Sequence, residues 1–176
     1  MNQSELNQYF NNIWRHTPFS NLKAELSGYS LIGKVKPNES VLDVGCGKNL
    51  FKGKIPNLVG IDPAFPEADY NLSLEDFVKV NTNKYDVAFC LGSINFGDRE
   101  QIESQIELLI GVLNDKNRIY WRCNPGLHDH ENEECKRVPF YPWTLEEHVR
   151  LSDKYGYKLI ECRWESNNRI YSEWSR

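Results

Sequence analysis

Two short segments in the first third of the chain contain the residue types that bind a nucleotide. The first is an apolar run that ends in a glycine turn, which contains Asp43, Gly45, Cys46 and Gly47. The second is the run 58–61, which ends in Asp62 and Pro63. Glycine lets the backbone approach a ligand that a side chain would block. A carboxylate at the end of the next strand can accept hydrogen bonds from ribose hydroxyls. The pattern therefore predicts a nucleotide site at the ends of two neighbouring strands.

The spacing of the glycines argues against two common nucleotide motifs. In the dinucleotide fingerprint G-x-G-x-x-G, the third glycine would fall on Leu50. The phosphate-binding pattern G-x-x-x-x-G-K-[ST] does not occur in the sequence. What remains is Asp43, two residues before the first glycine, whose carboxylate can pair with an ammonium group.

The segment 41–47, Val-Leu-Asp-Val-Gly-Cys-Gly, resembles motif I of class I S-adenosylmethionine (SAM)-dependent methyltransferases. Residues 60–63 resemble the next motif of that family, and residues 85–93 resemble its fourth strand and the loop that follows. The resemblance covers roughly residues 40–175. It implies an α/β, Rossmann-like doubly wound sheet of about seven strands, in the order 3-2-1-4-5-7-6 with the last strand antiparallel.

The resemblance also implies which residues surround SAM. The two glycines of the turn would lie along its methionine part, with Asp43 near the amino group. Asp62 would hold the ribose, and Leu74 would face the adenine. Leu91 and Gly92 would line the floor of the site. The expected cofactor-binding set is Asp43, Gly45, Cys46, Gly47, Asn49, Asp62, Pro63, Leu74, Leu91 and Gly92.

Two features depart from the family pattern. Many members carry a third glycine where this chain has Asn49, although asparagine tolerates left-handed backbone better than most residues. The span between the glycines and Asp62 is short and contains Pro56, so the first helix must be only a turn or two. These departures leave open a SAM-binding module without transfer activity.

Catalytic candidates are expected in the loops after the fourth and fifth strands, because ligands bind outside the carboxyl ends of an open α/β sheet. Methyl transfer requires a nucleophile held in line and, for a hydroxyl acceptor, a base. We select Asn95, His128 and His130. The two histidines lie in the long loop 124–143, and the unperturbed pKa of histidine, near 6.5, suits a base. The alternative is that they are solvated loop residues.

No metal site is expected from the same loop. Zinc binds cysteine and histidine, and the loop region contains Cys123, His128, His130 and Cys135. Their spacing lacks the C-x2-4-C form of structural zinc sites.

The acceptor is expected to be a small molecule and not DNA. After the strand 85–90 the chain reads Leu-Gly-Ser-Ile-Asn. The Pro-Pro-aromatic and Pro-Cys motifs of DNA methyltransferases are missing. Methylation of RNA or protein within a complex is the alternative. The aromatic residues near this end of the sheet either cover a ring-bearing substrate or pack the loop onto the sheet, and they are Trp121, Phe140, Tyr141 and Trp143.

Composition sets further bounds. The chain has 176 residues, 40% of them hydrophobic, which is enough for one domain with a core. Its net charge of −4 argues against a broad nucleic-acid surface. No apolar run of about 18 residues predicts a membrane span, and the N-terminal residues do not resemble a signal peptide, so cytoplasm is the expected location. Five dispersed cysteines indicate reduced thiols. Nothing in the sequence predicts the oligomeric state.

Hydrophobic periodicity and capping patterns place the remaining elements. Residues 1–35 are expected to form a helical cap, with Ser4 as the cap of a first helix over 5–15 and Thr17-Pro18 at the start of a second. The core of residues 40–176 is expected to contain a short strand at 68–72, helices at 74–80, after Asp98 and after Thr144, strands at 85–91 and 118–123, and a hairpin of 157–164 with 169–174.

Overall fold

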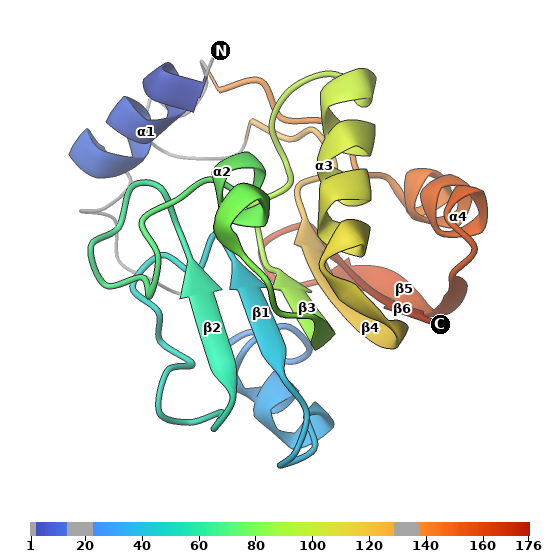
Figure 1. Cartoon of the computed structure of the whole chain (residues 1–176). Helices are drawn as coiled ribbons and strands as arrows, with labels where there is room; N and C mark the ends of the chain where they lie inside the picture. The colour runs from blue at the N-terminus through green and yellow to red at the C-terminus, as the bar shows by residue number, and fades with distance from the viewer. Residues whose placement is uncertain (1–2, 14–22, 129–137) are drawn as a thin grey trace.

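The computed structural model describes residues 3–13, 23–128 and 138–176, and six strands of these ranges form one sheet in the order β2-β1-β3-β4-β6-β5 (Figure 1). The strands are β1 (Val41–Val44), β2 (Leu58–Ile61), β3 (Tyr85–Cys90), β4 (Leu113–Cys123), β5 (Lys158–Glu165) and β6 (Arg169–Ser175). Strands β1 to β4 run parallel to one another, whereas β6 is antiparallel to both β4 and β5. The sheet therefore ends in the antiparallel hairpin that the sequence predicts.

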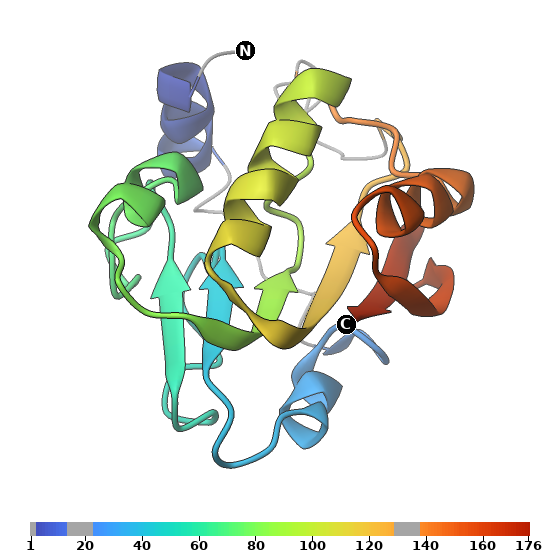
Figure 2. The same ribbon diagram turned by 45° about the vertical axis from the view of Figure 1, so that its right-hand side comes forward.

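Helices cover both faces of the sheet. They are α1 (Gln3–Asn12), the 3-10 helix η3 (Tyr29–Lys34), α2 (Leu74–Val80), α3 (Arg99–Gly111) and α4 (Leu145–Lys154). Helices α2 and α3 lie on one face, α4 packs against the β5–β6 hairpin, and η3 lies on the opposite face (Figures 1 and 2). Helix α1 lies beyond the carboxyl ends of β1 and β2 in both views. Among the described helices, none has the length and apolar character needed to cross a membrane.

The prediction of a strand at 68–72 is wrong. Tyr70 makes one isolated bridge to Ile61, and the amides of Asp69 and Tyr70 both donate to the carbonyl of Gly60. The pairing of this segment with β2 is therefore limited to one parallel bridge, which is too short to form a strand. Without this strand, the remaining order agrees with the expected order 3-2-1-4-5-7-6.

The predicted helix caps in the core are confirmed. The side chains of Ser73, Asp98 and Thr144 each accept a hydrogen bond from a backbone N–H three residues later. The cap predicted at Ser4 is wrong, because α1 already begins at Gln3. The proposed second helix start at Thr17-Pro18 lies outside the described residues, and residues 23–28 contain no α-helix.

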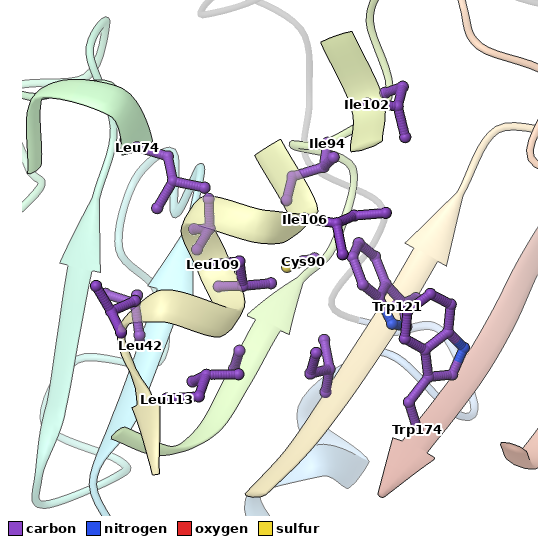
Figure 3. Close-up of a cluster of buried hydrophobic side chains, with 14 of the residues drawn as sticks. Leu42, Leu74, Cys90, Ile94, Ile102, Ile106, Leu109, Leu113, Trp121 and Trp174 are labelled. Atoms are coloured by element: carbon purple, nitrogen blue, oxygen red, sulfur yellow. The ribbon is translucent and has the colours of Figure 1, made fainter. Parts of the chain in front are cut away.

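The larger core lies under α3, whose apolar side chains point onto β1, β3 and β4 (Figure 3). Ile102, Ile106 and Leu109 are fully buried there. The burial of one such side chain on folding stabilises the protein by about 1.5–3 kcal/mol relative to leaving it exposed to water. A second cluster on the other face packs Leu31 of η3 against β1 and β3. Burial on both faces explains why β3 is an unbroken apolar run after its second residue.

The N-terminal segment is fastened to the last hairpin by one carboxylate. Glu165 accepts hydrogen bonds from the amides of Leu26 and Ser27, the latter at 2.9 Å, and from the Ser27 hydroxyl. The same carboxylate forms an almost fully buried ion pair with Arg122 of β4, at 3.5 Å. Charge-assisted hydrogen bonds of this kind are stronger than neutral ones, so they fix the approach of residues 26–27 to the sheet.

A buried histidine was not identified from the sequence. His148 of α4 is enclosed by the rings of Trp121, Trp143 and Trp174, with the Trp143 ring centroid 4.8 Å away. Neither ring nitrogen has a hydrogen-bond partner in the part of the chain that the structure describes. Burial lowers the pKa of His148 from 6.5 to about 3, against a smaller opposing effect of the Glu147 charge. The folded protein therefore holds this imidazole neutral.

We expect His148 to make the fold sensitive to acid. Its pKa is lower in the folded than in the unfolded state, so the unfolded chain gains a proton first as pH falls below 6.5. Between pH 7.5 and 5 this residue alone should remove about 2 kcal/mol from the free energy of unfolding. Urea unfolding followed by tryptophan fluorescence measures it. His148→Phe should abolish this loss, while a His128→Gln control should keep it, and equal pH slopes in all three proteins would contradict the assignment.

Candidate active site

Two backbone hydrogen bonds hold the glycine turn against the end of β2. The amides of Gly45 and Cys46 donate to the carbonyl of Ile61, at 2.8 and 3.0 Å. Gly45 and Gly47 have φ values of +68° and +53°, in the left-handed region where glycine carries no steric cost. The turn after β1 and the carboxylate of Asp62 are therefore adjacent, as the two sequence motifs predict.

The loop after β3 packs directly on the same turn. A side chain at Gly45 would place its Cβ 2.4 Å from the Cβ of Ser93, which is far too close. Gly92 has a φ of +113°, so this loop also needs a glycine where it leaves β3. Leu91 packs against the core cluster on the η3 face. The ends of β1, β2 and β3 thus meet at one place, and Gly45 is what allows the contact.

The carboxylate of Asp62 organises the loops around it. One oxygen accepts from the amides of Ala64 and Phe65, at 2.8 and 3.1 Å, and the other accepts from Gly47, at 3.0 Å. A carboxylate has about four lone-pair positions, so one position remains, on the oxygen that faces the glycine turn. Burial raises the pKa of Asp62, and the three backbone donors oppose that shift. This carboxylate can accept one further hydroxyl.

The carboxylate of Asp43, unlike that of Asp62, lacks backbone donors in the described part of the chain. Asp43 is 4% exposed, and no hydrogen bond to its carboxylate is found among the described residues. Burial, and secondarily the charge of Asp62, raise the pKa of Asp43 to about 7. A buried carboxylate without donors is costly unless a cation or proton accompanies it. The turn therefore contains an acceptor suited to a cationic ligand group.

Asn49 takes the left-handed conformation expected of it, with a φ of +52°. Its amide nitrogen donates to the carbonyl of Glu67 and to Asp69. A side chain at Gly60 would lie 2.6 Å from the Asn49 Oδ1 and 2.9 Å from the Cys46 Sγ. The asparagine is therefore accommodated by a glycine on the neighbouring strand.

Asp69 belongs to this arrangement but was not identified from the sequence. Its carboxylate accepts from the Gly60 amide at 2.9 Å and from Lys52 at 2.6 Å. These bonds lower its pKa against the effect of burial. No motif marks this residue, because its partners are nine and seventeen positions away in the chain.

Comparison with known proteins finds matches for the structure but none for the sequence. No protein-family model matches the chain, and no curated protein matches it. Its structure superposes on magnesium protoporphyrin IX methyltransferase from Synechocystis with bound S-adenosylhomocysteine (SAH), at a TM-score of 0.70 and 15% identity, over 99% of this chain and 100% of that one. The chain has the fold of SAM-dependent methyltransferases.

Two further methyltransferases agree in fold over most of their length. The 1,6-didemethyltoxoflavin-N1-methyltransferase of Burkholderia thailandensis matches at a TM-score of 0.70 and 11% identity, over 98% of this chain and 85% of that one. The plantazolicin methyltransferase with a pentazolic analogue and SAH matches at a TM-score of 0.61 and 20% identity, over 97% of this chain and 94% of that one. The resemblance seen in the sequence motifs is thus confirmed at the level of structure.

The other expected cofactor-binding residues of this methyltransferase fold differ in exposure. Pro63 is partly exposed and begins the turn that Asp62 organises. Leu74 is 7% exposed and belongs to the main core cluster, where Figure 3 shows it with Leu42 and the side chains of α3. Little of the Leu74 side chain is left to face a ligand.

The catalytic candidates do not form one cluster among the described residues. Asn95 is buried, its Oδ1 accepts from the amide of Asn124 at 3.3 Å, and its carbonyl accepts from the amide of Tyr141 at 2.8 Å. It therefore joins the loop after β3 to the two ends of the loop after β4. His128 is exposed, with its ring centroid 6.2 Å from that of Phe140. His130 lies outside the described residues.

No metal-binding group is found in the described part of the chain. Within residues 3–13, 23–128 and 138–176, no three His, Cys, Asp or Glu side chains are grouped to hold a metal ion. Cys135, like His130, lies outside these ranges. The described cysteines are all free thiols, namely Cys46, Cys90, Cys123 and Cys162.

The close contact at Gly45 predicts a specific loss of stability. Gly45→Ala must strain a left-handed residue and also displace Ser93. Gly53 provides a matched control, because its φ is +76° and a Cβ added there would meet nothing within 4 Å. We expect Gly53→Ala to cost about 1 kcal/mol and Gly45→Ala at least about 1–2 kcal/mol more, measured by urea unfolding. Equal costs would show that the turn and the β3 loop do not touch.

Removing the charge of Asp43 should stabilise the ligand-free protein. Its pKa is higher in the folded than in the unfolded state, so its stabilising effect is present below pH 3.8 and is lost as pH rises through about 7. Asp43→Asn should therefore gain up to about 4 kcal/mol at pH 8 and little at pH 4. The exposed Asp115→Asn serves as a control. Denaturant midpoints at the two pH values measure the effect, and no gain at pH 8 would contradict it.

Proposed function

We propose that this protein is a SAM-dependent methyltransferase that acts on a small-molecule acceptor. The observation that carries the proposal is the buried carboxylate of Asp43, which has no donor among the described residues and lies beside the glycine turn of a methyltransferase fold. The superposed structures named above include complexes with SAH. Their named substrates include magnesium protoporphyrin IX and 1,6-didemethyltoxoflavin, which are small molecules.

The residues present fit SAM. Asp43 would pair with the ammonium group of the methionine part, which satisfies a carboxylate that the described fold leaves without a donor. Asp62 would accept a single ribose hydroxyl on its remaining lone pair, so the second hydroxyl must find another partner. Gly45 and Gly47 would let the backbone approach the ligand. Cys46, Asn49, Pro63, Leu74, Leu91 and Gly92 complete the proposed set, with Leu74 contributing least because it is core.

Bound SAM would supply a methyl group on a sulfonium, which is already activated for transfer. The chain then has to place the acceptor in line and, for a hydroxyl acceptor, to remove a proton. His128 is available for proton removal because its ring is exposed at the carboxyl end of β4. His130 is proposed for the same role from its position in the sequence. Asn95 would act by fixing the loops on either side.

A SAM-binding module without transfer activity is the second candidate. It is favoured by the placement of the catalytic candidates among the described residues, where Asn95 is buried in hydrogen bonds with backbone groups and His128 is exposed, so the two form no common cluster. Binding without turnover would identify this case. Both candidates share the same cofactor site, so the cofactor is tested first.

Calorimetric titration should show micromolar binding of SAM and SAH and no binding of NADH or ATP. Because the ligand ammonium pairs with the ionised form of Asp43, affinity should fall about sixfold from pH 7.5 to pH 6, since a group with a pKa near 7 takes up a proton while the α-amino group of the ligand becomes fully protonated. Asp43→Asn should weaken binding strongly and remove this pH dependence. The control Asp115→Asn should leave both unchanged.

Binding of neither sulfur nucleotide by the folded protein would overturn the proposed function. Binding that is equally strong at both pH values would keep the cofactor but remove Asp43 from its ammonium site.

A further inference from the structure

Four rings from different segments form a continuous row at the carboxyl end of the sheet. Phe10 of α1 contacts Phe96, with ring centroids 5.4 Å apart and planes at 69°. Phe96 contacts Phe140 at 5.4 Å, and Phe140 contacts His128 at 6.2 Å. We call these four residues the aromatic row. Phe96 follows β3, His128 follows β4, and Phe140 precedes α4, so the row assembles only in the folded chain.

The row differs from the two cores of the molecule. The core beneath α3 consists of side chains with almost no exposed surface, whereas Phe10, Phe96 and Phe140 are all partly exposed and His128 is exposed. The small cluster that contains the three phenylalanines has two buried members, Tyr9 and Val138, among its described residues. The row is therefore partly exposed at the end of the sheet, and its phenylalanines pack against only two buried residues among the described ones, Tyr9 and Val138.

Backbone contacts fix the centre of the row independently of α1. Phe96 and Phe140 form an isolated antiparallel bridge, and the Tyr141 amide donates to the Asn95 carbonyl at 2.8 Å. The two rings are therefore held at a set spacing by the loops that carry them. A rigid pair of aromatic faces costs little conformational entropy when a ligand binds.

The same loop connects the row to the proposed cofactor site. Phe96 is three residues after Ser93, and Ser93 is the residue that packs against Gly45 of the glycine turn. Ligands of open α/β sheets bind beyond the carboxyl ends of the strands. The row therefore stands beside the place where an acceptor must lie.

We propose that the aromatic row is a wall of the acceptor site and selects a flat aromatic acceptor over a saturated one of the same size. The proposal rests on the proposed function, since it names the substrate class of that site. Aromatic rings gain free energy from edge-to-face and offset-stacked contacts beyond the area they bury. A saturated ring gains the burial alone. Phe96 and Phe140 are the specificity-determining residues, because the bridge between their loops fixes both rings.

The test compares two probes of similar shape, 2-naphthol and decahydro-2-naphthol, titrated into SAH-saturated protein and followed by ligand-observed NMR. We expect 2-naphthol to bind roughly fivefold more tightly than its saturated counterpart, as expected from one or two aromatic contacts. Phe96→Leu and Phe140→Leu keep an apolar side chain but remove the ring, so each should abolish the preference. Trp164→Leu, at an exposed aromatic on the outer strand β5, should leave it unchanged.

Each variant is also titrated with SAH and unfolded thermally. Unchanged SAH affinity and thermal midpoint together with a lost preference support the proposal. Equal binding of the two probes by the unmodified protein, or a preference that survives both leucine substitutions, overturns it. If SAH does not bind, the proposed function fails, and the ring preference is then measured on the ligand-free protein as a separate result.

Discussion

The site depends on the carbonyl of Ile61, which accepts the amides of Gly45 and Cys46. This shared acceptor ties the turn after β1 to the end of β2. Because Gly45 has no side chain, the loop after β3 can then pack on the same turn. Three strand ends and their loops meet there above the main core, and the shared backbone acceptor together with the absence of a Cβ at Gly45 defines the centre of the site.

Around this centre, two aspartates lie in different environments. Asp62 is hydrogen-bonded by three backbone amides and shapes its own loop. Asp43 is buried, has no donor among the described residues, and has its pKa raised to about 7. The fold therefore bears an electrostatic cost at one position, which a cationic ligand group would relieve. Such an arrangement is typical of a site whose stability has been given up for binding.

Local patterns predicted much of this fold, because caps and turns depend on residues three or four positions apart. The caps at Ser73, Asp98 and Thr144 were predicted for this reason, as was the left-handed Asn49. The strand at 68–72 was predicted wrongly, since its pairing depends on how the chain leaves β2. The environment of His148 and the aromatic row were missed because they join residues far apart in sequence, and no local pattern reports such contacts.

The hydrogen bonds between Glu165 and residues 26–27 can form only late in the synthesis of the chain. A ribosome releases residues 26–27 well before Glu165, which lies 138 positions beyond Ser27. Contacts of such long sequence separation form late in folding, because closing the intervening loop costs entropy. Most of the sheet must therefore be in place before the N-terminal segment finds its anchor. During translation, the newborn chain would pass through a stage with an assembled glycine turn and an unfastened N-terminal segment.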